Sequence, residues 1–111
     1  MNGFNVNNVS FGGVCARTPI VEHFGTEGKQ RARFVVRNGK DSDDPEDRTY
    51  IECVAYPPAA DEVISYVQKG DDIVVEGRLA QEQWKDTKTG ERRERIKIIV
   101  RKVYWNQARP L

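Results

Sequence analysis

Residues 48–58 read Arg-Thr-Tyr-Ile-Glu-Cys-Val-Ala-Tyr-Pro-Pro, an alternating stretch that ends in two prolines. Successive side chains of a β-strand point to opposite faces, so Ile51, Cys53 and Ala55 share one face. The other face carries Tyr50 and Tyr56. Two consecutive prolines remove two hydrogen-bond donors and fix φ, and we therefore expect the strand to end before them.

After the prolines, apolar residues at helical spacing predict a short helix. Ala60, Val63, Ile64 and Val67 recur every three or four residues, and Gly70 stands where a C-terminal cap would fall. The helix should therefore have about ten residues, which is at the short end of the usual range.

Four further stretches alternate as strands do, and they lie at 6–14, 31–37, 72–84 and 92–105. Gly12 and Gly13 indicate a bulge or a sharp bend in the first of them. The second has an apolar face, made of Ala32, Phe34 and Val36, and a basic face. The segments between strands are expected to be connectors: 17–29, the acidic loop 38–47 and a turn at 86–91 in which Gly90 can adopt positive φ.

The predicted order is therefore three strands, one helix and two strands. Five antiparallel-looking strands with one short helix between the third and fourth match the all-β, five-stranded Greek-key barrel known as the OB-fold. A chain of 111 residues has room for one core, so we expect a single domain over residues 1–111.

Composition and charge narrow the classes of function. The chain is 38% hydrophobic, 32% charged and has a net charge of +1, so any binding of a polyanion needs locally segregated charge. Its apolar runs are too short to span a bilayer and its start has no secretory pattern, which favours a cytoplasmic protein that contacts no membrane. Cys15 and Cys53 have no spacing typical of zinc or redox sites. We expect no cofactor and no metal.

The strand segments also resemble those of a known family. Asn-Val-Ser-Phe-Gly-Gly at 8–13, Ala-Arg-Phe at 32–34, residues 48–56, Lys-Gly-Asp at 69–71 and Val-Glu-Gly-Arg-Leu at 75–79 resemble, in order, the bacterial single-stranded DNA-binding protein family. The likeness extends from about Asn5 to Val103 and includes Trp84, Asp86 and Gly90. It implies sequence-tolerant binding of single-stranded DNA, in replication, recombination or repair at the nucleoid, by a homo-oligomer. A tetramer is favoured, and a dimer is possible.

The resemblance makes Tyr50, Tyr56 and Trp84 the residues that stack on bases. The alternation of the strands reaches the same three, because each lies on an otherwise polar face. Stacking accepts any base, since every base has a π-face. Phosphates need cations, and two segments supply them: 29–37, and 85–102, which holds eight basic and three acidic residues. The expected phosphate contacts are Lys29, Arg31, Arg33, Arg37, Arg78, Lys85, Arg92 and Arg93.

The sequence departs from the family pattern in two places, one in a loop that often carries a stacking residue and one at the C-terminus. The family often has a further stacking Trp where this chain has Asn-Gly-Lys at 38–40. Many members also carry an acidic, Phe-terminated tail that recruits enzymes, whereas this sequence stops at Leu111. We therefore expect no such recruitment tail. A specialised paralogue, a phage or mobile-element version, and a relative of the primosomal replication protein all fit this pattern.

Other functions find less support. His23 is the one histidine, and no motif places a nucleophile beside it, so we expect no catalytic residue and no enzyme. A calcium loop beginning at Asp41 and Asp43 fails because Pro45 and Glu46 replace a ligand and the required glycine. The alternative that stays open is a protein-interaction or primosome-type barrel, a structural subunit of a replication complex. Its binding would lack the steep salt dependence of phosphate contacts.

Overall fold

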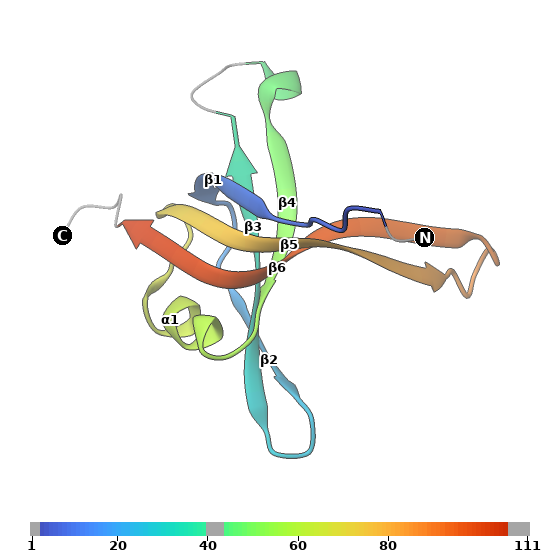
Figure 1. Ribbon diagram of the computed structural model, residues 1–111, viewed down its shortest axis with the longest axis horizontal. Helices are drawn as coiled ribbons and strands as arrows, with labels where there is room; N and C mark the ends of the chain where they lie inside the picture. Colours follow the sequence, from blue (N-terminus) through green and yellow to red (C-terminus); the bar gives the residue numbers. More distant parts are fainter. Residues whose placement is uncertain (1–2, 40–43, 107–111) are drawn as a thin grey trace.

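The computed structural model describes residues 3–39 and 44–106, which form one six-stranded sheet with a short helix against it (Figure 1). The elements are β1 (Val9–Cys15), β2 (Ile20–Phe24), β3 (Lys29–Asn38), a 3-10 turn η1 (Pro45–Asp47), β4 (Thr49–Ala55), α1 (Ala59–Tyr66), β5 (Asp72–Lys85) and β6 (Arg92–Asn106).

The sheet closes into a barrel. Its strand order is β1-β5-β6-β4-β3-β2, and the end of β1 also pairs with β3, where Val14 lies opposite Arg37 and Cys15 opposite Val36. This confirms the OB-fold with its helix between the two halves of the chain. The strands are not all antiparallel, however, because β4 and β6 run parallel. The helix crosses over after β4 and the β5–β6 hairpin then reverses the chain, so β6 returns in the direction of β4.

The segment 17–29, expected to be a connector, contains the additional strand β2. It forms a hairpin with β3, and Gly25 and Gly28 take positive φ values of 72° and 71° in the turn. None of the five residues of β2 is fully buried. The alternation of buried apolar residues that reveals the other strands is therefore missing here, while Pro19 and the glycines indicate a loop.

The core lies between the barrel wall and α1. Ala32, Phe34 and Val36 are buried as their alternation predicts, and the helix covers one end of the barrel with Ala59, Ala60, Val63 and the following Val67. The helix has eight residues and ends at Tyr66, earlier than Gly70 suggests. Gly70 instead belongs to the turn before β5, with φ of 95° and its N–H donating to the Cys15 carbonyl at 2.8 Å.

The pairing of β1 with β5 passes through Gly12 and Gly13 without a register shift, so it has no bulge at this pair of glycines. A Cβ on Gly13 would lie 1.9 Å from the Arg37 carbonyl oxygen, so glycine allows β1 to meet β3 here. The bulge lies elsewhere, in the β5–β6 pairing at Glu76 and Gly77.

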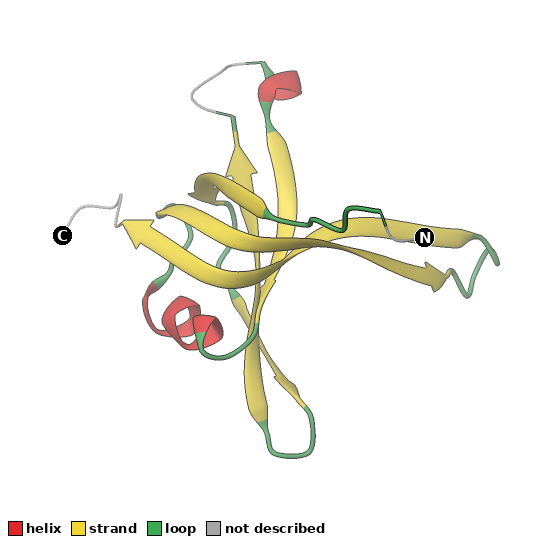
Figure 2. Cartoon of the chain, viewed as in Figure 1, coloured by secondary structure: helices red, strands yellow, loops and turns green. Residues whose placement is uncertain are grey.

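Beyond this bulge the β5–β6 hairpin extends past the barrel as a two-stranded arm (Figure 2). Burial on β5 ends at Gly77, and Leu79 is already exposed. The predicted turn at its tip is present: the Asp86 N–H donates to the Glu91 carbonyl at 2.8 Å, and Gly90 has φ of 74°. The N-terminal segment runs along the arm (Figure 1), where the Asn7 side chain makes two 2.8 Å hydrogen bonds to the backbone of Leu79.

Candidate nucleic-acid interface

The side of the sheet turned away from the core crosses β2, β3, β4, β6 and β5 without a break. Residues opposite each other on neighbouring strands point to the same side. Glu22 lies opposite Arg31, and Glu52 lies opposite both Val35 and Lys97. This register defines the outer face, whose polar and aromatic side chains are Glu22, Lys29, Arg31, Arg33, Arg37, Tyr50, Glu52, Arg78, Glu82, Trp84, Arg93, Arg95 and Lys97.

Two of the three expected stacking residues present exposed rings on this face. Tyr50 is 56% exposed and lies opposite Arg37, near the N-terminal end of β4. Trp84 is 41% exposed and lies on the arm opposite Arg93. The guanidinium carbon of Arg95 lies 5.0 Å from the centre of the Trp84 ring, a cation–π contact that covers one side of the indole.

Tyr56, just past the end of β4, has more contacts with its neighbours than Tyr50 does. Its ring meets Phe24 edge to face, with centroids 5.2 Å apart and planes at 89°. Arg31 donates from Nη1 to the Tyr56 hydroxyl at 3.2 Å, and its guanidinium carbon lies 6.0 Å from the centre of that ring. The ring is half-buried as a result, and it offers less free surface than Tyr50 or Trp84.

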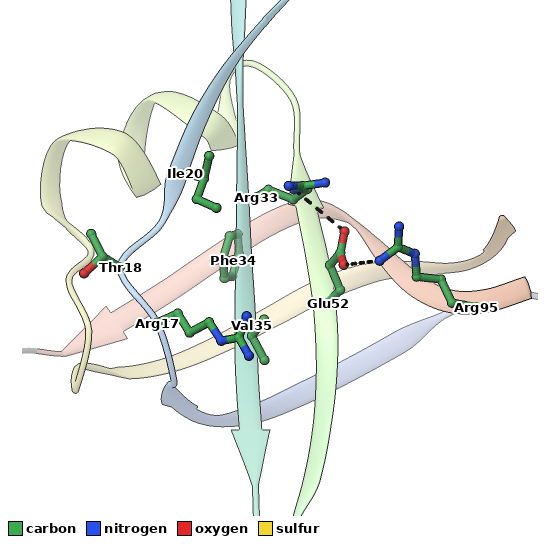
Figure 3. Close-up of a pocket in the computed structure, with 8 residues that line it drawn as sticks. All are labelled: Arg17, Thr18, Ile20, Arg33, Phe34, Val35, Glu52 and Arg95. Carbon is green, nitrogen blue, oxygen red and sulfur yellow. Dashed lines mark hydrogen bonds and ion pairs between the residues drawn. The ribbon is translucent and has the colours of Figure 1, made fainter. Parts of the chain in front are cut away.

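The cations of the outer face alternate with carboxylates. Glu22 pairs with Arg31 at 2.9 Å and with Arg33 at 3.6 Å. Arg33 lies 3.9 Å from Glu52, which accepts a 3.1 Å hydrogen bond from Arg95 (Figure 3).

The chain of ion pairs continues onto the arm. Arg95 lies 3.8 Å from Glu82, and Lys97 donates to the same carboxylate at 3.0 Å. The hydrogen bond from Lys97, with the charges of Lys97, Arg95 and Arg33, holds the pKa of the Glu82 carboxyl below its usual value. Glu82 is therefore ionised at neutral pH. We call these seven side chains the ion-pair chain: Arg31, Glu22, Arg33, Glu52, Arg95, Glu82 and Lys97.

A pocket of about 230 Å³ opens beside this chain, with Arg33, Glu52 and Arg95 on one side and Arg17 on the other (Figure 3). Ile20 and Val35 supply apolar wall between them. Arg17 has no role predicted from the sequence, and Arg95 and Lys97 are expected only as members of the basic segment 85–102. Their place on the outer face depends on β6 lying beside β4, which alternation within one strand does not reveal.

The structure separates the expected phosphate contacts into two groups. Lys29, Arg31, Arg33, Arg37, Arg78 and Arg93 belong to the outer face. Lys85 and Arg92 lie opposite each other on the other side of the arm, where Arg92 donates to Gln83 at 3.2 Å. These two do not share a face with Trp84.

Several of the outer-face cations also have local carboxylate partners. Arg93 lies 3.6 Å from both Asp86 and Glu91, and Lys29 lies 3.7 Å from Glu27. Arg37 differs: its Nε is buried and has no hydrogen-bond partner within the described residues. Arg37 lies directly opposite Tyr50.

The other residues considered for metal binding or catalysis are placed as follows. Within residues 3–39 and 44–106, no group of three or more His, Cys, Asp or Glu side chains could hold a metal ion. Asp41 and Asp43 of the rejected calcium loop lie outside these residues. His23 is on the exposed hairpin strand β2, with its ring 3.4 Å from Gln30. Among the described helices, none is both long and apolar enough to cross a membrane.

Comparison with known proteins agrees with this architecture. A single-stranded DNA-binding protein of Borreliella burgdorferi is 37% identical over 51 residues, which are 46% of this chain and 34% of that protein. The match thus spans about a third of the relative. The solved structure described as "Plasmodium falciparum SSB complex with ssDNA" superposes with a TM-score of 0.77, at 20% identity, over 98% of this chain and 100% of that one.

A family model gives the widest match in sequence. The model of the single-strand binding protein family covers residues 6–105, which include β1 to β5 in full and all of β6 except its last residue, Asn106. With this much of the sequence matched, the chain belongs to the single-strand binding protein family.

Proposed function

We propose that this protein binds single-stranded DNA without sequence preference, using the outer face of its barrel. The observation that carries the proposal is the outer face itself, where the exposed rings of Tyr50 and Trp84 lie on one continuous sheet with a row of arginines. Its family supports the same function, as do the names of the Borreliella protein and the Plasmodium complex.

The two kinds of side chain serve different parts of the strand. Bases stack on Tyr50 and on the free side of Trp84, and each such contact contributes about 1–3 kcal/mol to binding. Phosphates bind Lys29, Arg31, Arg33, Arg37, Arg78 and Arg93 along the same face, together with Arg95 and Lys97. Tyr56 contributes a smaller contact at the β2–β3 end. Lys85 and Arg92 lie on the other side of the arm, so they contact phosphates only if the DNA wraps around the arm.

We also propose that the protein acts as a homo-oligomer, with the segment Asn5 to Phe11 in the interface and a tetramer as the favoured state. Within the described residues, Val9–Gly13 pair with β5 on one edge only, and Phe4 and Val6 are fully or largely exposed. An unpaired strand edge beside exposed apolar side chains favours association with another copy. Light scattering at micromolar concentration tests this, and a monodisperse monomer would refute it.

The cellular role that fits is protection of single strands during replication, recombination or repair in the cytoplasm, with no catalytic step.

The test of single-strand binding is a titration of tryptophan fluorescence with poly(dT) at low and high salt, with a duplex as the control. Quenching by the single strand that weakens with salt, and little response to duplex, supports the proposal. Absence of both quenching and binding refutes it. A Trp84→Phe variant assigns the signal, since Trp105 stacks on Tyr66 at 5.5 Å.

A further inference from the structure

The outer face holds three carboxylates among its cations. Glu22, Glu52 and Glu82 come from three different strands, β2, β4 and β5, and each one contacts two cations of the ion-pair chain. Their side chains retain 27%, 21% and 38% exposure. They are therefore open enough to meet a bound strand, and they lie among the cations that its phosphates require.

A carboxylate and a phosphate bind an arginine through the same N–H groups and in the same plane. Arg95 uses Nη1 for Glu52 at 3.1 Å and turns Nη2 toward Glu82 at 3.8 Å. Lys97 uses its ammonium for Glu82 at 3.0 Å. A phosphate arriving at either cation has to replace these contacts or share them, and each carboxylate that stays in place repels it.

We propose that Glu52 and Glu82 compete with backbone phosphates for Arg33, Arg95 and Lys97, and thereby lower the affinity and the salt dependence of single-strand binding. The inference rests on the proposed function, since it assigns two residues that tune the same site. Glu22 has the same relation to Arg31 and Arg33 at the other end of the chain of ion pairs.

Of the three carboxylates, Glu52 should lower the affinity for DNA most, because it bridges cations of two different strands. It contacts Arg33 of β3 and Arg95 of β6, and Arg95 in turn covers the Trp84 ring at 5.0 Å. Glu52 also lines the pocket that contains Arg17 (Figure 3). Removing its charge therefore takes one carboxylate partner from Arg33, which keeps Glu22, and one from Arg95, which keeps Glu82. It also removes the carboxylate charge from the lining of the pocket, which holds Arg17, Arg33 and Arg95.

The test compares Glu52→Gln and Glu82→Gln with the unaltered protein in binding a fluorescein-labelled oligo(dT), measured by fluorescence anisotropy over a range of sodium chloride concentrations. We expect Glu52→Gln to bind about three- to tenfold more tightly at low salt, since one charge facing nearby phosphates is removed. The slope of log K against log salt should steepen by up to about 0.7, the value of one added phosphate contact on a single strand. Glu82→Gln should change both quantities in the same direction.

Glu94→Gln is the matched control. Glu94 lies on the same hairpin and changes the net charge equally, but it points to the other side of the arm, where it accepts a 2.6 Å hydrogen bond from Gln81. An equal gain in this control would show that net charge alone raises affinity, which would overturn the inference. So would unchanged or weaker binding by a folded Glu52→Gln variant, because Glu52 would then serve to hold Arg95 in place. If even the unaltered protein fails to bind, the proposed function is wrong as well.

Discussion

The guanidinium of Arg95 lies 5.0 Å from the centre of the Trp84 ring and joins the aromatic part of the outer face to its ionic part. The two residues lie diagonally across the β5–β6 arm, two positions out of direct register, since Trp84 pairs with Arg93 and Glu82 pairs with Arg95. Arg95 also donates to Glu52 on β4. The arm is thus connected to the barrel wall by side chains, and its tryptophan has one side covered and one side open.

Trp84→Ala should weaken binding of oligo(dT) by about 1–3 kcal/mol, the loss of one stacking contact, with little change in the melting temperature. The small effect on stability follows because Trp84 is exposed and lies on the arm, outside the core. Anisotropy titration and thermal unfolding measure the two effects. Trp105→Phe is the control, since Trp105 packs against the core. Equal affinity of a folded Trp84→Ala variant would mean that this ring does not stack on DNA.

Tyr50→Ala and Tyr56→Ala should separate binding from stability. Tyr50 is exposed, so its loss should lower affinity and leave the unfolding free energy almost unchanged. Tyr56 packs against Phe24 and accepts a hydrogen bond from Arg31, so its loss should cost roughly 1–2 kcal/mol of stability. Urea unfolding monitored by circular dichroism measures this. Equal stability of the two variants would contradict the assignment.

The lowered pKa of Glu82 leads us to expect that the stability of the folded protein depends on pH. The Glu82 pKa is lowered in the folded state, chiefly by the hydrogen bond from Lys97, so the folded protein binds a proton there less readily than the unfolded chain. The stabilisation is present above the unfolded pKa, whose ordinary value is 4.5, and is lost as pH falls through the lower folded pKa. The melting temperature should therefore fall less on acidification in Glu82→Gln than in the unaltered protein.

Both cysteines should be unreactive toward thiol reagents in the folded protein at neutral pH. Burial raises the pKa of Cys15, and burial raises that of Cys53 to about 12, so almost no thiolate is present to react. Neither side chain is accessible. Colour development with a chromogenic disulfide should appear only on adding denaturant. Rapid labelling without unfolding would show that the barrel opens locally around β1 or β4.

Alternation along single strands was enough to predict the barrel, its core and the exposed aromatic residues. Phe34 and Cys53 are buried, and Tyr50 and Trp84 are exposed, as that pattern requires. It could not reveal β2, which buries no residue fully, or the parallel pairing of β4 with β6. The ion-pair chain escaped prediction for both reasons, since its member Glu22 lies on β2. Glu52 and Arg95 are 43 positions apart and meet only through that pairing.

Gly13→Ala should be strongly destabilising, whereas Gly12→Ala should be mild, although the two glycines are adjacent. A Cβ on Gly13 would lie 1.9 Å from the Arg37 carbonyl oxygen, and this backbone atom moves only if β1 separates from β3 where the barrel closes. On Gly12 the nearest atom is a methyl carbon of Val74 at 3.0 Å, on an exposed side chain that can shift. We expect a loss of about 2–4 kcal/mol for the first and under about 1 kcal/mol for the second, as for backbone clashes compared with surface adjustments. Denaturant unfolding of both variants measures these losses. A loss for Gly13→Ala as small as that for Gly12→Ala would show that the closure of β1 on β3 contributes little to stability.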